Sequence, residues 1–248
     1  MLEDIKNGID FYIRSKTRFS RKNFVEKNEN LIERNRMENL YTKSVLESGF
    51  EKRVFSSVKV LDIGCKNWFY AKGEYEFFNS FCDEIFLDGV EIDAYRLYSN
   101  FYSRYEVAKY YTKGLKNTNY IVGNLLDLEG KYDYIIWFLP FVLVEPHQYW
   151  GLPKKYFYPE KLLEHAFNLL AENGQMLIIN QGIEESQVQK DLLNKLGIKY
   201  TDLDEIKNEF FEYKHKRYGV LVKKIKNKKD SHWGVFLKNA DGRGRTGT

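Results

Sequence analysis

From Val58 onward, the chain alternates short apolar runs with longer segments of helical periodicity, and this alternation restricts the folds that it can adopt. Such a pattern is typical of a parallel sheet flanked by helices. The expected strands are 58–64, 85–93, 119–124, 131–139, 175–182, 198–203 and 217–225. The expected helices are about 68–81, about 94–113, 159–170 and about 185–196. The last two strands have no helix between them.

Residues 1–55 precede this pattern and have helical periodicity of their own. Ile5, Ile9 and Tyr12 share one helical face, and a second periodic run ends at Ser48-Gly49. The Gly/Arg-rich end of the chain lacks the apolar residues that packing requires. We therefore expect a helical extension or lid (1–55), a main α/β domain (56–226) and a basic, disordered tail (227–248).

The candidate site follows from the expected sheet. Ligands of open α/β sheets bind beyond the carboxyl ends of the strands, where the strand order reverses. The residues at the ends of the first four strands are Asp62, Gly64 and Cys65; Glu91 and Ile92; Asn124 and Leu125; and Phe138. We expect these residues to surround a ligand.

These four stretches, in this order and at these intervals, resemble the class I S-adenosylmethionine-dependent methyltransferases of the Rossmann-like superfamily. The resemblance covers about 58–225, and the turn 169–174 resembles the turn that precedes strand five in that family. It implies a seven-stranded Rossmann-like sheet, mostly parallel with an antiparallel last strand, with helices on both faces, to which the expected N-terminal helical extension is added. It also implies S-adenosyl-L-methionine as cofactor and methyl transfer to a small or medium-sized acceptor.

The resemblance assigns cofactor contacts residue by residue. In that family the loop after strand one approaches the methionine half, the acid closing strand two binds the ribose hydroxyls, and a polar residue after strand three reads the adenine. The matching residues here are Asp62, Gly64 and Cys65; Glu91; and Asn124 with Leu125. Gly64 allows close approach of the backbone, and a buried carboxylate such as Glu91 can accept hydroxyl protons. Asp93 suits the N-cap of the next helix.

The loop after strand one departs from the Gly-x-Gly-x-Gly pattern of the family, since Lys66 and Trp68 stand where glycines are usual. We expect negative φ at Lys66, so that Lys66 or Asn67 can meet the carboxylate of the cofactor near the following helix N-terminus. Alternatively, the loop closes over an empty site and the chain is a catalytically silent scaffold. A dinucleotide dehydrogenase is a weaker alternative, because Lys66 and Asn67 break its Gly-x-Gly-x-x-Gly fingerprint.

Residues 140–159 contain all four prolines of the chain, so we expect an irregular loop that forms the acceptor wall. Methyl transfer from a sulfonium is a direct displacement that mainly requires alignment and exclusion of water. A base is needed only if the acceptor arrives protonated, and His147 and Glu145 are the candidates. Alternatively, His147 makes a structural hydrogen bond and has no role in catalysis.

Basic residues gather near both ends of the chain. Arg14, Lys16, Arg18, Arg21 and Lys22 form one cluster, and 214–229 form another. These segments leave open a nucleic-acid (RNA) methyltransferase that holds phosphates, beside the simpler interpretation of solvated basic ends.

Composition argues against several other classes. No apolar run approaches the roughly 20 residues of a membrane helix, and the polar start lacks the build of a signal peptide. Cys65 and Cys82 provide no disulfide framework, and the spacing of cysteines and histidines fits no zinc site. We therefore expect a soluble, cytoplasmic protein without a bound metal or a membrane partner.

Overall fold

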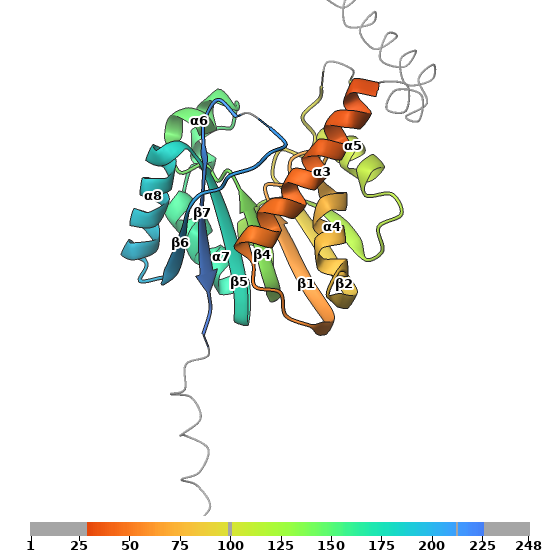
Figure 1. Cartoon of the computed structure of the whole chain (residues 1–248). Coiled ribbons are helices and arrows are strands. Elements are labelled where there is room, and N and C mark those ends of the chain that lie inside the picture. The colour runs from red at the N-terminus through yellow and green to blue at the C-terminus, as the bar shows by residue number, and fades with distance from the viewer. Residues whose placement is uncertain (1–28, 99–100, 212, 226–248) are drawn as a thin grey trace, which may run out of the picture.

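The computed structural model describes residues 29–98, 101–211 and 213–225, and it places helices on both sides of one central sheet (Figure 1). The strands are β1 (Phe55–Ile63), β2 (Cys82–Glu91), β3 (Thr118–Val122), β4 (Tyr132–Phe138), β5 (Leu170–Gln181), β6 (Tyr200–Glu205) and β7 (Arg217–Lys223). The α-helices are α3 (Glu29–Gly49), α4 (Ala71–Asn79), α5 (Arg104–Tyr111), α6 (Val144–Tyr149), α7 (Pro159–Leu169) and α8 (Gly182–Lys195). Two short 3-10 helices are η1 (Leu125–Asp127) and η2 (Lys154–Tyr156).

The seven strands lie in the order β3-β2-β1-β4-β5-β7-β6. Neighbours from β3 to β5 pair in parallel, and β7 runs antiparallel between β5 and β6. The predicted mostly parallel sheet with an antiparallel last strand is therefore confirmed. Because the strand order reverses between β1 and β4, the carboxyl ends of these strands border the crevice in which such sheets bind ligands.

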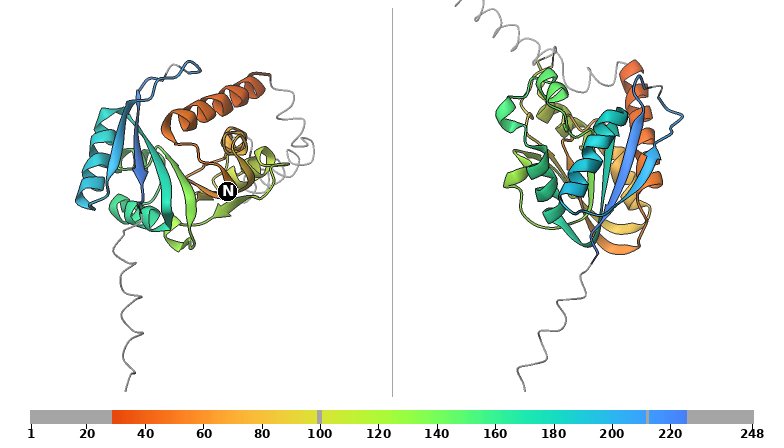
Figure 2. Two further views of the ribbon diagram at one scale, coloured as in Figure 1. Left: turned by 60° about the horizontal axis from the view of Figure 1, so that its bottom comes forward. Right: turned by 90° about the vertical axis from the view of Figure 1, so that its left-hand side faces the viewer.

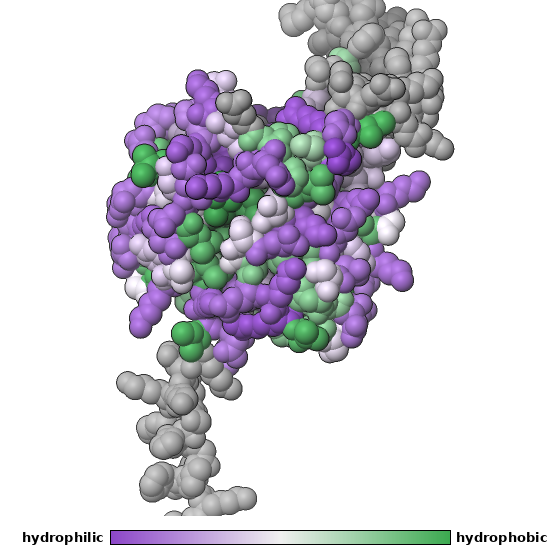
Figure 3. All heavy atoms as spheres, in the orientation of Figure 1, coloured by the Kyte–Doolittle hydropathy of each residue, from purple (hydrophilic) through white to green (hydrophobic). Residues whose placement is uncertain are grey.

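The sheet is buried on both faces, as expected where helices cover both sides of parallel strands. Along β1, Val58 and Val60 belong to one hydrophobic cluster, whereas Leu61 and Ile63 belong to the other. Helices α3 and α4 cover the first face, and α7 and α8 cover the second (Figure 2). In the orientation of Figure 1, apolar side chains also reach the surface between α3 and α8 (Figure 3).

Helix α3 contains the described part of the predicted N-terminal extension, and it packs closely on α4. A Cβ atom at Gly73 would lie 2.3 Å from the carbonyl oxygen of Asn39, so this contact requires glycine. The Asn39 side chain in turn accepts the Gly73 N–H at 2.6 Å. Val45 and Leu46 are fully buried in the core beneath. Helix α3 is therefore an integral layer of the α/β unit.

The prediction of one long helix after β2 is wrong for the first half of its range. Tyr98, Phe101 and Tyr102 do not share a helical face. Instead, the Tyr98 N–H donates to the Tyr102 carbonyl and the Phe101 N–H donates to the Tyr98 carbonyl, which defines a tight turn. Phe101 has a φ of +62° in that turn, which is incompatible with an α-helix.

Helix α5 begins only after this turn because Ser103 and Glu106 form a capping box. The side chain of Ser103 accepts the Glu106 N–H, and the Glu106 carboxylate accepts the Ser103 N–H. The prediction that Asp93 caps the helix is therefore also wrong. Asp93 pairs with Arg96 at 2.5 Å instead.

Three sequence-based expectations fall outside the described residues: the helical face of Ile5, Ile9 and Tyr12, the basic cluster at 14–22 and the tail at 227–248. Within the described part of the chain, no helix has both the length and the apolarity needed to cross a bilayer.

Candidate functional site

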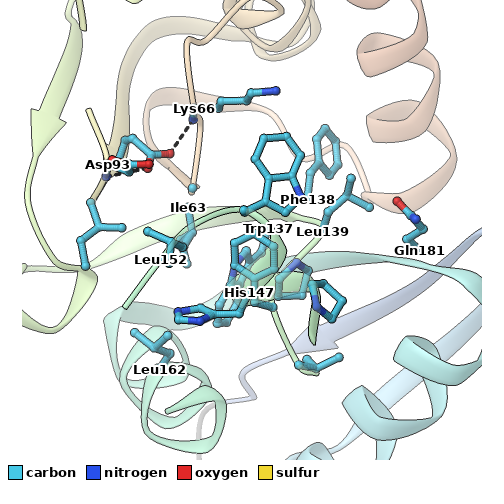
Figure 4. Close-up of a pocket in the computed structure, with 18 of the residues that line it drawn as sticks. Ile63, Lys66, Asp93, Trp137, Phe138, Leu139, His147, Leu152, Leu162 and Gln181 are labelled. Atoms are coloured by element: carbon cyan, nitrogen blue, oxygen red, sulfur yellow. Dashed lines mark hydrogen bonds between the residues drawn. The ribbon is translucent and has the colours of Figure 1, made fainter. Parts of the chain in front are cut away.

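A cavity of about 810 Å³ opens at the carboxyl ends of the strands (Figure 4). Gly64 after β1, Glu91 of β2, Asn124 after β3, Phe138 of β4 and Gln181 of β5 all line it. Helix α3 and residues 140–159 complete its walls. Its volume lies within the roughly 300–1,000 Å³ of small-molecule sites.

Most of the predicted site residues line this cavity. They are Gly64, Lys66, Glu91, Ile92, Asn124, Leu125, Phe138, Glu145 and His147. Asp62, Cys65 and Asn67 are not among the lining residues. Asp62 and Cys65 are fully buried in the protein interior, so their predicted contact with a cofactor gains no support.

The loop after β1 has the positive φ angles that favour glycine at three alternate positions. The φ angles are +73° at Gly64, +56° at Lys66 and +45° at Trp68. The expectation of negative φ at Lys66 is therefore wrong. Because a left-handed conformation costs a side-chain-bearing residue roughly 1–2 kcal/mol, the surrounding contacts must offset the strain at Lys66 and Trp68.

Lys66 is held by contacts of its backbone and of its side chain. Its N–H donates to Oε2 of Glu91 at 2.9 Å, and its carbonyl accepts the Tyr120 hydroxyl. Its ammonium lies 4.5 Å from the centre of the Trp150 ring, and burial lowers the pKa of this lysine. The side chain therefore contacts the aromatic wall of the cavity.

Trp68 is fully buried and does not line the cavity. Its Nε1 donates to Oε2 of Glu74 at 2.8 Å. The indole fits because Gly89 of β2 has no side chain: a Cβ there would lie 2.8 Å from two indole carbons and 2.9 Å from Sγ of Cys65. The largest residue of the loop therefore fills the core and leaves the cavity open.

Two fully buried acids, Asp62 and Glu74, lie behind the loop. Burial raises the pKa of Asp62 to about 7 and raises the pKa of Glu74 well above its ordinary value. The Tyr70 hydroxyl donates to Asp62 at 3.1 Å, as the Trp68 indole does to Glu74. Since two adjacent buried carboxylates repel, this pair retains a proton to a higher pH than ordinary acids do.

Glu91 is 6% exposed, and its carboxylate already has several partners. Oε2 accepts the Lys66 N–H, while Oε1 accepts the Asp93 N–H at 2.8 Å and lies 3.4 Å from Nη1 of Arg104. A carboxylate oxygen can accept about two hydrogen bonds. Oε2 therefore retains capacity for one hydroxyl of a ligand in the cavity.

Arg104 is a site residue that the sequence did not indicate. It is buried, lines the cavity and pairs with both Glu91 and Asp93 at 3.4 Å. It also lies 5.9 Å from the centre of the Trp150 ring. The expected long helix placed this arginine in a helix interior, whereas the turn before α5 brings it to the cavity.

Asn124 connects the end of β3 to the start of α7. Its Oδ1 accepts the Leu126 N–H at 3.1 Å, which caps η1, and its Nδ2 donates to the Tyr158 hydroxyl at 2.6 Å. One amide hydrogen therefore remains for a ligand. Leu125 and Leu162 provide apolar surface nearby in the same cavity.

Residues 140–159 contain short helices, α6 and η2, where an irregular loop was expected. Trp150, just after α6, is 40% exposed and contacts both Lys66 and Arg104 through its ring. This segment therefore covers the cavity from above the strand ends and links three elements through cation–π contacts.

His147 of α6 is buried between the rings of Phe141 and Phe157, and Glu145 is exposed. Nδ1 of His147 has no hydrogen-bond partner within the described residues. Burial lowers its pKa, so the imidazole is neutral at physiological pH. His147 lies on the same side of the cavity as Leu162, and Gln181 lies on the opposite side (Figure 4).

The Gln181 side of the cavity contains residues that sequence reasoning missed. Arg217, the first residue of β7, pairs with Gln181 across the antiparallel ladder. Tyr41 of α3, Tyr213 and Glu185 of α8 line the same region. No local sequence signal unites these residues, because β7 reaches the carboxyl edge only by inserting between β5 and β6.

The basic residues of 214–225 do not form one surface. Lys216 pairs with Glu205 at 2.6 Å, Lys223 pairs with Glu51, and Lys224 donates to the carbonyls of Phe167 and Leu170. Arg217 and Lys223 stand at opposite ends of β7. The described residues therefore give no support to a phosphate-binding surface on this segment.

Among the described residues, no group of three or more histidine, cysteine, aspartate or glutamate side chains has the arrangement of a metal site.

Comparison with known proteins supports the fold through structure alone. No family model matches the chain, and no curated protein matches it by sequence. A SAM-dependent methyltransferase from Aquifex aeolicus is similar over 86% of this chain and 98% of its own, with 15% identity and a TM-score of 0.52. A putative class I S-adenosylmethionine-dependent methyltransferase from Listeria monocytogenes is similar over 77% of this chain and 60% of its own, with 12% identity and a TM-score of 0.52.

The chain therefore has the Rossmann-like α/β fold of class I S-adenosylmethionine-dependent methyltransferases, as the order of its strand-end residues predicted.

Proposed function

We propose that the protein binds S-adenosyl-L-methionine in this cavity and transfers its methyl group to a small or medium-sized acceptor. The observation that carries this proposal is Glu91. It is a buried carboxylate at the end of β2 that lines the cavity and retains acceptor capacity on Oε2. Beside it, the space where a Cβ of Gly64 would lie is open, which suits close approach of a ligand.

We infer the direction of the bound cofactor from the strand order together with the resemblance. In the resembling family, adenine lies after the third strand, ribose at the second and the methionine half after the first. The order β3-β2-β1-β4-β5-β7 supports the same arrangement here, in which we expect the adenine beside Asn124 and Leu125, the ribose beside Glu91 and the methionine half beside Gly64 and Lys66. The acceptor then occupies the remaining part of the cavity, over β4, β5 and β7.

When bound, the cofactor supplies an electrophilic methyl carbon that a nucleophilic atom of the acceptor displaces from sulfur. The residues of this chain provide alignment and exclusion of water. Glu91 fixes the ribose, the loop at Gly64 and Lys66 faces the methionine half, and Trp150 covers this region from above. Tyr41 and Phe138 provide aromatic surface on the acceptor side.

The role of His147 or Glu145 as a base stays a prediction. His147 is neutral and has an unpaired ring nitrogen in the cavity wall, which suits a proton acceptor. If His147 is the base, His147→Gln should reduce kcat by at least about 100-fold while cofactor affinity is preserved. If His147→Gln reduced cofactor affinity as much as kcat, His147 would instead have a packing role on the Leu162 side of the cavity.

Calorimetry with S-adenosylmethionine, S-adenosylhomocysteine and NAD tests the proposal directly. We expect micromolar affinity for the first two ligands, about −8 kcal/mol, and no competition by NAD. Labelled methyl donor and fractionated small molecules, RNA and DNA then test the acceptor class. The absence of binding by either adenosyl ligand would support a silent scaffold, and robust labelling of RNA would support the nucleic-acid alternative.

A further inference from the structure

Arg217 is a cation at the acceptor side of the cavity without an ionic partner. Its guanidinium stacks on the Tyr213 ring at 4.4 Å, and it lies near the Tyr41 hydroxyl. Both neighbours are neutral groups. Within 29–98, 101–211 and 213–225, Arg217 forms no ion pair, and its fully buried Nη1 has no hydrogen-bond partner.

Two glutamates lie near this arginine but do not neutralise it by direct contact. Glu38 of α3 pairs with Arg34 at 3.7 Å, and Glu185 of α8 accepts the N–H of Gln181 at 2.9 Å. Burial is the largest influence on both carboxyls and raises their pKa values. A buried cationic nitrogen is costly without a hydrogen-bond partner, so Nη1 is available to an anionic ligand.

The surroundings restrict the ligand further. Tyr41, Tyr213 and Phe138 provide aromatic surface in the same cavity, which suits an apolar body. A single arginine near two glutamates suits one negative charge better than the two charges of a phosphate. A planar carboxylate also matches the geometry of a guanidinium.

A second unpaired donor lies on the α8 side of the cavity. Gln189 is 1% exposed, lines the cavity, and its Nε2 has no hydrogen-bond partner among the described residues. It follows Glu185 by one helical turn, so both side chains lie on the same face of α8. The acceptor side therefore presents two buried donors from two elements, β7 and α8, to a ligand that accepts hydrogen bonds.

We propose that the methyl acceptor is an apolar or aromatic molecule with one carboxylate, and that Arg217 binds this carboxylate. The inference rests on the proposed methyltransferase function, because it assigns the part of the cavity beyond the cofactor to the acceptor. The carboxylate is an anchor in this arrangement, and the atom that receives the methyl group lies elsewhere on the acceptor.

The test uses benzoate, benzamide and benzylamine as probes of the full-length protein saturated with S-adenosylhomocysteine. These probes share one ring and differ in charge, and binding is followed by ligand-observed NMR titration. Arg217→Gln removes the anchor. Lys216→Gln is the matched control. Lys216 is exposed and pairs with Glu205, and its substitution removes the same charge as Arg217→Gln does. If Arg217→Gln is not folded, Arg217→Met retains an apolar stem against Tyr213.

We expect benzoate to bind the unmodified protein and the Lys216 variant at least about tenfold more tightly than it binds the Arg217 variants. Benzamide and benzylamine should bind weakly to all of them. Equal benzoate affinity in the Arg217 variants, no benzoate binding at millimolar concentration, or a preference for benzylamine would overturn the assignment. If S-adenosylhomocysteine still binds, any of these results overturns the acceptor proposal alone. If the unmodified protein does not bind S-adenosylhomocysteine, the methyltransferase proposal itself is refuted.

Discussion

The indole of Trp68 occupies the space that a side chain at Gly89 would need, since a Cβ there would lie 2.8 Å from two indole carbons. This contact joins the loop after β1 to the middle of β2. It explains how a tryptophan replaces a glycine in the loop without filling the cavity, because the ring extends into the core that Gly89 leaves open.

The first prediction concerns this pair. Gly89→Ala should lower the free energy of unfolding by about 1–3 kcal/mol through overpacking. In a Trp68→Phe background, which removes the two clashing carbons, the same alanine should cost about 1 kcal/mol less. Urea denaturation of the two single variants and the double variant measures the coupling. Strictly additive effects would mean that the two residues do not share this space.

A second prediction concerns the left-handed conformation of Lys66, with its φ of +56°. Lys66→Gly and Lys66→Ala remove the same contact with Trp150, but only glycine relieves the backbone strain. The glycine variant should therefore be more stable than the alanine variant by roughly 1 kcal/mol in urea denaturation. An alanine variant of equal or greater stability would indicate that the loop adopts another backbone path.

Third, Glu91→Gln should weaken binding of S-adenosylhomocysteine by about 1–3 kcal/mol, as measured by calorimetry. It should also lower the free energy of unfolding, since Glu91 is the buried ionic partner of Arg104. Glu84→Gln, an exposed acid on the same strand, is the control and should change neither quantity. Unchanged binding in the Glu91 variant would place the ribose elsewhere.

Fourth, the buried acids behind the loop predict a pH dependence of stability. The folded state holds a proton on Asp62 up to about pH 7, above the ordinary pKa of 3.8, so it binds more protons than the unfolded chain between these values. The contribution of Asp62 to stability is therefore greatest below about pH 4 and is lost as pH rises from about 4 through about 7.

Asp62→Asn should flatten this fall, because the amide cannot ionise. For one proton, the free energy of unfolding falls by about 1.4 kcal/mol per pH unit, and the Asn variant should lack this fall. Thermal unfolding across this pH range measures the effect, with the exposed Glu76→Gln on α4 as control. A slope that persists in the Asp62 variant would assign the proton to Glu74 or to another group.

The strands were predictable because their apolar runs alternate with helix-length segments, and their carboxyl-end residues followed from this, since Glu91 and Phe138 close two strands and Asn124 follows a third. The helix after β2 was mispredicted for a physical reason. Its tyrosines have helical spacing, but Ser103 and Glu106 form a capping box that starts the helix later, and that signal is present in the sequence.

Two other features, the backbone conformation of Lys66 and the position of Arg217, had no local signal in the sequence. Positive φ at Lys66 depends on the contacts of its backbone with Glu91 and Tyr120, which are distant in the chain. The approach of Arg217 to Tyr41 depends on the insertion of β7 between β5 and β6 and on the packing of α3. Such arrangements arise from tertiary structure, so a local pattern does not record them.

The position of β7 in the sheet has a consequence for assembly during synthesis. Among the described strands, β6 pairs with β7 alone, and β7 is made after it and must enter between β5 and β6. A nascent chain that ends before Arg217 can form the parallel strands from β1 to β5, but it cannot attach β6 or complete the acceptor side of the cavity. The edge of β5 therefore remains open until β7 has been synthesised, which makes this edge the natural place for premature intermolecular pairing and for the action of a chaperone.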